Sequence, residues 1–252
     1  MPSLKGGVSI SHSEYNGPNE WPFIQRTAGE VFWTDEGEGE EVSQGYAAKP
    51  WLRAYPDEVS PTLTVEDVAL YDLLRQAADR YGDATATVFY GARLSYRQVY
   101  DQARRVAGGL INLGVKKGDR VAIMLPNCPQ AVIAYYGALM AGAVVVQVNP
   151  LYMPRELRHQ VGDSGARVMI AIDLAYPKVS QLTLEHVVYT GLQDYMPAPM
   201  RWIAPLKLKP PRISYRKGVM PWSALLAAPP ITAPVPVTPA EDLALLQYTG
   251  AT

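Results

Sequence analysis

The chain has 252 residues, with 23 lysines and arginines against 24 aspartates and glutamates, and its formal net charge is −1. This balance argues against nucleic acid as the main partner, because binding to a phosphate backbone requires an excess of basic residues. Hydrophobic residues make up 48% of the chain and charged residues 19%, which is enough apolar material for a large core. The single cysteine, Cys128, excludes a disulfide framework and a metal site built from several cysteines.

Residues 1–47 differ in composition from the rest of the chain. They are polar and show no periodicity, and six acidic residues without any basic one lie between Glu30 and Glu41. Two interpretations are open, an acidic arm that binds a partner or a solvated extension, and such charge runs favour the second. We therefore predict a disordered extension over 1–47 and a folded domain over 48–252. Neither a signal peptide nor a membrane-spanning segment is indicated.

The first elements of the folded part are a helix, a hairpin and a second helix. A helix capped by Asp67 is predicted to end at Gly82, and its buried face is expected to consist of Leu70, Leu74, Ala77 and Tyr81. A strand over 85–90 and a turn at Gly91 follow. Ser95 and Gln98 have the spacing of a capping box, which begins the second helix. That helix is expected to bury an apolar stripe made of Val99, Ala103, Val106, Leu110 and Leu113.

Buried strands then alternate with helices. Near-continuous apolar strands are predicted at 120–125, 143–148, 168–172 and 186–190. Helices are predicted at 130–140, at 154–160 and, more weakly, near 177–184. The first strand–helix–strand unit is expected to be a right-handed parallel crossover. The alternation as a whole predicts an α/β fold with a doubly wound, mostly parallel sheet.

The segment 192–240 holds half of the 22 prolines. Such a density disfavours long regular elements, so we predict an extended excursion over the surface. The apolar run at 243–246 predicts a return to a buried strand. The sequence stops soon after that strand, and we expect a sheet that is incomplete at its C-terminus.

The strand at 243–246 leads into a run of small residues, which are Thr249, Gly250, Ala251 and Thr252. Small residues let backbone N–H groups approach a phosphate, and threonine hydroxyls add further donors. A plain turn after a strand explains the same residues equally well. The run is therefore a candidate phosphate-binding loop only in combination with its surroundings.

A second candidate is a basic segment. Six basic residues and no acidic residue lie between Arg201 and Lys217. One interpretation is a patch that approaches anionic lipid, and the other is a solvated proline-rich loop. The residues of the lipid-surface hypothesis are Arg201, Trp202, Lys207, Lys209, Arg212, Arg216 and Lys217.

The remaining reactive side chains predict no catalytic group and no metal site. Cys128 is expected to be a buried structural residue, because a free cysteine behaves as a small hydrophobe. The three histidines, His12, His159 and His186, are scattered and lack the spacing of metal ligands.

Several short motifs occur in a specific order and spacing. They are Leu70-Tyr71-Asp72-Leu73-Leu74, Leu94-Ser95-Tyr96, Lys117-Gly118-Asp119-Arg120-Val121-Ala122, Leu125-Pro126-Asn127, Val148-Asn149-Pro150-Leu151-Tyr152 and Asp242-Leu243-Ala244-Leu245-Leu246-Gln247-Tyr248-Thr249-Gly250. With them, residues 48–252 resemble the N-terminal part of the adenylate-forming acyl-CoA synthetases, and specifically the bacterial long-chain fatty acid–CoA ligases.

The resemblance implies a two-step reaction in which ATP and a fatty acid give an acyl-adenylate and pyrophosphate, and CoA then gives acyl-CoA and AMP. ATP, Mg²⁺ and CoA are the implied cofactors. In the family a loop rich in Thr, Ser and Gly, ending in Lys-Gly, holds the ATP phosphates. Thr249, Gly250 and Thr252 match its start, whereas Ala251 stands where the family usually has glycine, and a methyl group there crowds a phosphate.

The rest of the active site is implied to lie beyond Thr252, including the loop lysine, the acidic Mg²⁺-site residue and the mobile C-terminal domain. We therefore expect no tight cofactor binding and no activity from this chain alone. The resemblance also implies a cytoplasmic location, transient contact with a membrane surface and a homodimer.

Two alternatives to a fatty acid–CoA ligase fragment stay open. One is a shortened, non-catalytic α/β module that binds a ligand or partner, and the other is a different acyl or aryl acid–CoA ligase of the same superfamily. A module evolved to stand alone is expected to cap or charge the sheet edge after Tyr248. The sequence shows no such device, which favours the fragment.

Overall fold

The structure is a computed structural model that describes residues 25–27, 30–32, 49–62 and 66–249. The chain divides into two compact units, Met1–Val65 and Glu66–Thr252. In the first unit, strands β1 (Gln25–Thr27) and β2 (Glu30–Phe32) form an antiparallel pair, and η1 (Pro50–Ala54) is a 3₁₀ helix. Most of the predicted extension over 1–47, with most of its acidic run, lies outside the described residues.

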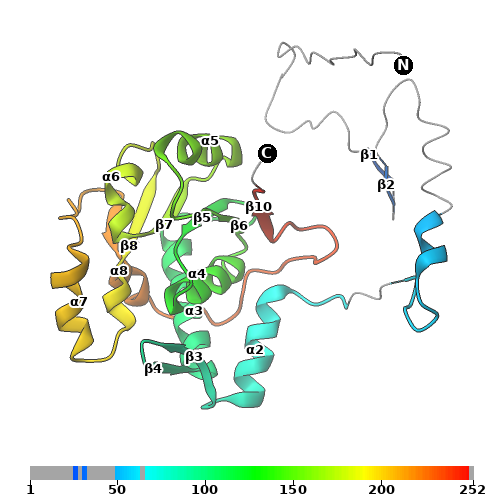
Figure 1. The fold of residues 1–252 in the computed structure, drawn as a ribbon, viewed down its shortest axis with the longest axis horizontal. Helices are drawn as coiled ribbons and strands as arrows, with labels where there is room; N and C mark the ends of the chain where they lie inside the picture. The colour runs from blue at the N-terminus through cyan, green and yellow to red at the C-terminus, as the bar shows by residue number, and fades with distance from the viewer. Residues whose placement is uncertain (1–24, 28–29, 33–48, 63–65, 250–252) are drawn as a thin grey trace, which may run out of the picture. The chain divides into compact units, whose positions relative to one another are not determined.

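A six-stranded parallel sheet with the order β10-β6-β5-β7-β8-β9 forms the centre of the second unit (Figure 1). Its strands are β5 (Arg120–Met124), β6 (Val144–Gln147), β7 (Val168–Ile172), β8 (His186–Thr190), β9 (Val219–Pro221) and β10 (Leu245–Gln247). All five neighbouring pairs are parallel. The chain passes from β5 to β6 and then crosses back to β7 on the other side of β5, which confirms the doubly wound α/β fold.

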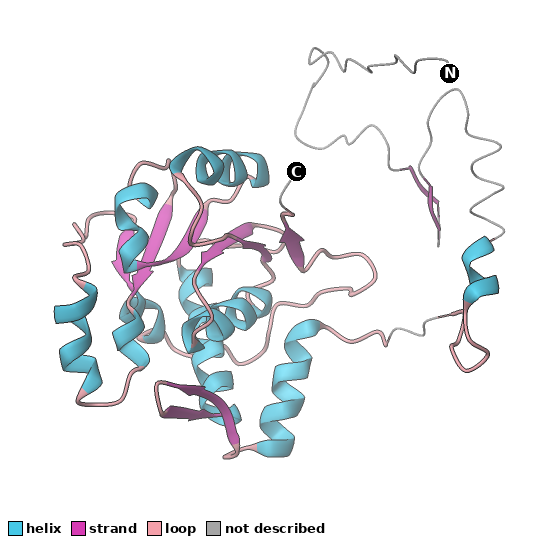
Figure 2. Cartoon of the chain, viewed as in Figure 1, coloured by secondary structure: helices cyan, strands magenta, loops and turns pink. Residues whose placement is uncertain are grey.

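Helices cover both faces of this sheet (Figure 2). The helices of this unit are α2 (Leu70–Tyr81), α3 (Tyr96–Asn112), α4 (Pro129–Met140), α5 (Pro154–Ser164), α6 (Tyr176–Val179), α7 (Met200–Leu208) and α8 (Trp222–Leu226). Figure 1 shows α3 and α4 on one side of the sheet and α5 and α6 on the other. Right-handed crossovers place helices in this way when the strand order reverses. A separate antiparallel hairpin, β3 (Thr85–Phe89) and β4 (Ala92–Ser95), confirms the predicted hairpin.

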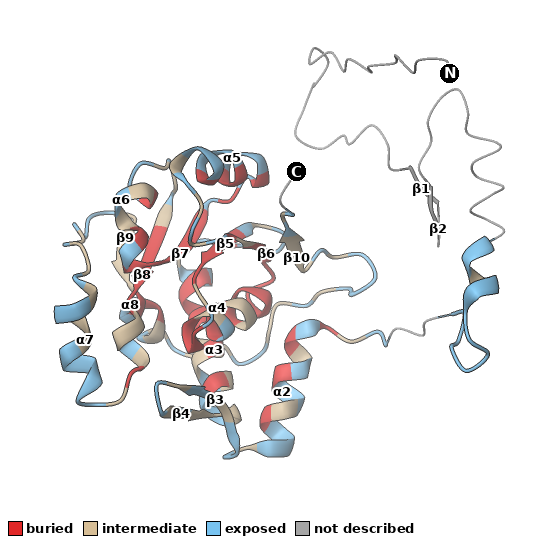
Figure 3. Ribbon diagram, viewed as in Figure 1, coloured by how far each residue is buried: buried red, intermediate tan, exposed pale blue. Residues whose placement is uncertain are grey.

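The core is centred on β5, β7, α3 and α4, where the buried residues concentrate (Figure 3). The predicted capping box at the start of α3 is confirmed, because the Gln98 N–H donates to Ser95 Oγ at 3.2 Å and the Ser95 N–H donates to Gln98 Oε1 at 2.9 Å. Helices α3 and α4 approach closely at Gly137, where an added Cβ would lie 2.7 Å from Cγ1 of Val106. The glycine therefore sets the distance between the two helices.

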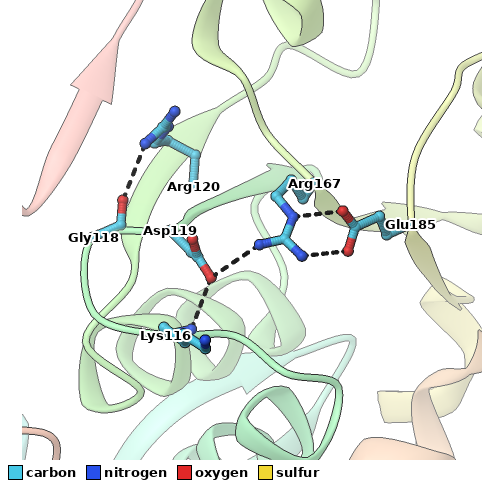
Figure 4. A network of polar contacts seen from close by, with 6 residues as sticks. All are labelled: Lys116, Gly118, Asp119, Arg120, Arg167 and Glu185. Atoms are coloured by element: carbon cyan, nitrogen blue, oxygen red, sulfur yellow. Dashed lines mark hydrogen bonds and ion pairs between the residues drawn. The ribbon is translucent and has the colours of Figure 1, made fainter. Parts of the chain in front are cut away.

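Charged side chains connect the amino ends of three central strands (Figure 4). Arg167, just before β7, pairs with both carboxylate oxygens of Glu185, just before β8, at 2.6 Å each. The same guanidinium lies 3.6 Å from Asp119, just before β5, and Asp119 also accepts the Lys116 N–H at 2.8 Å. This network helps to set the register of the strands at the edge opposite to their carboxyl ends.

Helix α2 differs from its prediction in its cap and in its buried face. Ala69 rather than Asp67 is the N-cap, and no side chain caps the helix. Leu70 and Tyr81 are 41% and 48% exposed, whereas the buried residues are Tyr71, Leu74 and Ala78. Two neighbouring faces of this helix have nearly the same apolar periodicity, and packing selects the one with Tyr71, whose hydroxyl donates to the Val235 carbonyl at 3.4 Å.

The segment 192–240 contains regular structure, so the prediction of an extended surface path is wrong for much of it. The 3₁₀ helix η3 (Leu192–Tyr195), helix α7, strand β9 and helix α8 all fall within it. Trp222 and Leu225 of α8 are buried in the core. The prolines are tolerated because most lie outside the helices and strands, and Pro221 closes an edge strand, where a missing N–H costs little.

Two further elements are less regular or less buried than predicted. Helix α6 (Tyr176–Val179) is shorter than the helix predicted near 177–184. Strand β10 is half-buried rather than buried, because it lies at the edge of the sheet and pairs only with β6.

Candidate functional site

Strand β10 carries the candidate phosphate loop to the carboxyl edge of the sheet. It runs parallel to β6, with Leu245 opposite Val145, and the Val145 N–H donates to the Ala244 carbonyl at 2.9 Å. Thr249 follows the strand and is exposed. Open α/β sheets bind ligands outside the carboxyl ends of their strands. Gly250, Ala251 and Thr252 lie outside the described residues, so phosphate binding by the loop stays a prediction.

The residue before Thr249 is held by a side-chain contact. The hydroxyl of Tyr248 donates a hydrogen bond to a carboxylate oxygen of Asp163, which lies on α5. Burial raises the pKa of Tyr248, and the bond to Asp163 raises it further. The tyrosine therefore remains a neutral donor, and the chain leaves the sheet from a fixed position.

The residues before β10 are also anchored. Asp242 lies 2.7 Å from Nζ of Lys117 and accepts the Thr238 N–H at 2.6 Å. The hydrogen bond from Lys117 holds the pKa of Asp242 below its usual range. Lys117 belongs to the turn before β5, so two of the sequence motifs meet here. Both ends of β10 are thus tied to neighbouring elements.

The loop after β6 lies at the same edge and is partly apolar. Asn149 accepts the Leu151 N–H at 2.9 Å on its side-chain oxygen, which forms a turn. Leu151 and Met153 are exposed. Gln160 donates from Nε2 to the Gln147 carbonyl at 2.7 Å and so connects α5 to β6. The edge next to β10 therefore presents a defined turn with uncovered apolar side chains.

A cavity of about 700 Å³ lies further along the carboxyl edge, near the ends of β8 and β9. A polar network stands beside it. Gln130, which is fully buried, donates to Thr190 Oγ1 at 3.2 Å and to the Gly191 carbonyl at 2.8 Å. Thr190 in turn donates to Asp194 at 2.8 Å. This network is not among the residues predicted from the sequence, although a lone glutamine in an otherwise apolar helix is a signal for it.

Other polar side chains line the same cavity. Burial raises the pKa of Asp173, which follows β7 and accepts a hydrogen bond from Gln193 at 3.2 Å. Burial also raises the pKa of Tyr195 to about 12. Tyr195 accepts the Trp222 indole N–H at 3.2 Å and donates to Gln102. These contacts join α3, η3 and α8 into one cavity wall. None of the hydrogen bonds just named pairs a nucleophilic side chain with a catalytic base.

The other sequence candidates have simple surroundings. Cys128 is buried at the N-cap of α4, as predicted, and burial raises the pKa of its thiol. His159 is exposed on α5, His186 begins β8, and His12 lies outside the described residues. Within the described part of the chain, no group of three or more His, Cys, Asp or Glu side chains is placed to hold a metal ion.

All seven residues of the lipid-surface hypothesis are exposed. Arg201, Trp202 and Lys207 lie on α7, and Lys209 is its C-cap. Arg212 follows the helix, whereas Arg216 and Lys217 line a small hollow that Glu185 also borders. No helix in the described residues has the length and apolar character needed to cross a membrane. Lipid contact by this segment stays a prediction.

The parallel sheet and its helices define an α/β domain, and comparison with known proteins assigns its family. The family model "AMP-binding enzyme" matches residues 74–252, so the chain belongs to the AMP-binding enzyme family. The long-chain-fatty-acid–CoA ligase of Bacillus subtilis (strain 168) is 38% identical over 214 residues, which cover 81% of this chain and 38% of the relative. The enzyme of the same name from Salmonella typhimurium is 37% identical over 221 residues, with the same coverage of 81% and 38%.

Solved structures show the same fold. The structure of a long-chain-fatty-acid–CoA ligase from Archaeoglobus fulgidus matches with a TM-score of 0.60 and 22% identity, over 76% of this chain and 36% of that one. The chain spans 38% of the length of the curated relatives named above. It thus corresponds to one part of those relatives.

Proposed function

We propose that the chain is the N-terminal part of an ATP-dependent fatty acid–CoA ligase. The observation that supports this most is the position of Thr249, after a parallel edge strand at the carboxyl edge of the sheet, in a chain of the AMP-binding family. The relatives' names point to long-chain fatty acids as the substrate class. We propose a cytoplasmic location and a homodimer as well, on the resemblance alone.

In the first step, a carboxylate oxygen of the fatty acid attacks the α-phosphorus of ATP. The bond from that phosphorus to the bridging oxygen breaks, and pyrophosphate leaves. In the second step, the sulfur of CoA attacks the acyl carbon, the thiol loses its proton, and AMP leaves with the electron pair of the broken C–O bond. The products are acyl-CoA, AMP and pyrophosphate.

This chain contributes the scaffold and the first donors of the phosphate loop. Thr249, Gly250 and Thr252 would offer backbone N–H groups and hydroxyls to the pyrophosphate part of ATP. The Tyr248–Asp163 bond fixes the point from which these donors start. The family resemblance implies that the acidic Mg²⁺-site residue lies beyond Thr252, so we derive no step through the metal.

The proposal is tested on the natural gene product that contains these residues. We expect it to convert palmitate, ATP and CoA into palmitoyl-CoA, and Thr249→Ala with Thr252→Ala is expected to raise the KM for ATP. Ala251→Gly serves as the matched loop variant, since glycine restores the family residue and is expected to keep or improve ATP binding. Turnover of aryl acids instead of fatty acids would move the chain to another ligase of the superfamily. Absence of adenylate with every acid would favour the non-catalytic binding module.

A further inference from the structure

The side chain of Lys178 joins helix α6 to the turn that follows β6. Its ammonium nitrogen donates to the Pro150 carbonyl at 2.6 Å and to the Tyr152 carbonyl at 2.8 Å. Helix α6 follows β7, whereas the turn follows β6, and β5 lies between these two strands in the sheet. The lysine therefore connects segments that leave two strands which are not neighbours.

The two carbonyls take the place of a carboxylate partner for this lysine. Lys178 is half-buried, and burial lowers the pKa of its ammonium group. Among the described residues, no ion pair includes Lys178. A charged group that loses water is unfavourable unless other polar atoms replace the lost hydrogen bonds. The carbonyls of Pro150 and Tyr152 provide that replacement, so the position of the turn and the position of the charge depend on each other.

The turn that Lys178 holds begins level with Thr249. In the parallel pair of β6 and β10, Gln147 lies opposite Gln247. Asn149 and Thr249 are each two residues further along the chain. Neighbouring strands lie about 4.8 Å apart, so the turn leaves the sheet beside the start of the candidate phosphate loop. A displaced turn would therefore change the space next to that loop.

We propose that Lys178 is a positioning residue of the phosphate-binding site, and that it acts through the turn at 149–152. Its two hydrogen bonds keep the turn in place beside Thr249. Its ammonium group also covers two carbonyl oxygens, whose partial negative charge is unfavourable near a triphosphate. This inference rests on the proposed function, because it takes the loop after β10 to bind the phosphates of ATP.

The test measures palmitoyl-CoA synthesis by variants of the natural gene product that contains these residues. Lys178→Met removes both hydrogen bonds and the charge, and it is expected to raise the KM for ATP roughly tenfold while the KM for palmitate stays the same. Lys178→Arg keeps the charge and several donors, and it is expected to restore the KM for ATP. Lys116→Met is the matched control, since it makes the same substitution at an exposed lysine before β5, at the amino edge of the sheet.

The split between KM and kcat separates this role from a purely structural one. A raised KM for ATP with an unchanged kcat indicates lost binding of ATP. A lower kcat with an unchanged KM for ATP would overturn the proposal, because a partly unfolded enzyme loses active molecules and not affinity. An equal rise in KM for ATP in Lys116→Met would overturn it as well. So would a Lys178→Arg enzyme that keeps the raised KM.

Two further measurements keep the test decisive. Far-UV circular dichroism and the Tm establish that Lys178→Met is folded. If it does not fold, Lys178→Gln replaces it, since the amide keeps donors without the charge, and a rise of the KM for ATP is again expected. Activity of the unchanged protein distinguishes the two levels of the account. An unchanged protein that forms no adenylate with any acid overturns the proposed function and this inference together, whereas an active protein with an unaffected Lys178→Met variant overturns this inference alone.

Discussion

The hydroxyl of Tyr248 and the carboxylate of Asp163 are joined by a hydrogen bond that connects the end of β10 to helix α5. Asp163 lies in the last turn of α5, which leads from β6 to β7. Strand β10 is an edge strand with β6 as its single neighbour, so backbone pairing on one side leaves the exit of the chain weakly defined. The side-chain bond supplies the missing constraint just before Thr249.

Tyr248→Phe is expected to lower the free energy of unfolding by about 1 kcal/mol, because it removes one exposed hydrogen bond to a charged acceptor. Burial and the Asp163 bond raise the pKa of Tyr248. The contribution is therefore complete below the unfolded-state pKa of about 10, and it is lost only as the pH rises through the folded-state value. Urea denaturation at pH 7 and pH 9 should give the same difference between the two proteins. Tyr55→Phe, at an exposed tyrosine, is the control, and equal effects of the two substitutions would refute the role of the bond.

Gly137→Ala and Gly162→Ala are expected to change stability in opposite directions. A Cβ at Gly137 would meet Val106 Cγ1 at 2.7 Å and the Ala103 carbonyl at 3.0 Å, and forced overpacking of this kind costs about 2 kcal/mol. A Cβ at Gly162 of α5 would meet open space, so alanine there should stabilise the chain by roughly 1 kcal/mol through helix propensity. Thermal unfolding of both variants measures the pair. If Gly137→Ala left stability unchanged or raised it, α3 and α4 would not depend on this glycine for their close approach.

The capping box at the start of α3 is expected to behave as a coupled pair. Ser95→Ala should destabilise the chain by about 1 kcal/mol, since the Gln98 N–H loses its acceptor. Gln98→Ala removes the reciprocal bond, and the double variant should cost less than the two single variants together. Gln98→Glu is the control that keeps an acceptor in place. Strict additivity in urea denaturation would contradict the reciprocal arrangement.

The Arg167–Glu185 pair is expected to make stability depend on pH in the acid range. The hydrogen bonds from Arg167 lower the pKa of Glu185. A lowered folded-state pKa means that the stabilisation is complete above the unfolded-state value of about 4.3, and that it is lost as the pH falls through the folded-state value. The difference in unfolding free energy between the unchanged chain and Glu185→Gln should therefore be constant above about pH 6 and vanish in strong acid. A difference that stays the same down to pH 2 would show that the carboxylate charge plays no part.

The parallel sheet was predictable because buried strands carry a strong local signal. Runs such as Val168–Ile172 are apolar at every position, and their alternation with helical periods defines the topology. The capping box at Ser95 was predictable for a similar reason, since both partners lie within one turn. By contrast, the buried face of α2 depends on a contact between Tyr71 and Val235, which are far apart in the sequence. No local pattern contains that information.

The candidate site was predictable only in part. The small residues after β10 stand out in the sequence, and so does the basic charge of residues 201–217. The network around Gln130 and Thr190 did not stand out, because its members come from α4, the end of β8 and η3 and meet only in the folded chain. The apolar side of α7 was also missed, since the density of prolines argued against any helix there. Pro205 lies within that helix, whereas the neighbouring prolines in the sequence lie outside it.

The most direct test is palmitate-dependent exchange of pyrophosphate into ATP by the 252-residue chain. We propose that this chain supplies the scaffold and the start of the phosphate loop, and the family resemblance implies that the loop lysine and the acidic Mg²⁺-site residue lie beyond Thr252. We therefore expect no exchange above the background of a protein-free reaction. Exchange that depends on palmitate and on this chain alone would contradict this proposal, because a complete adenylation site would then lie within these residues.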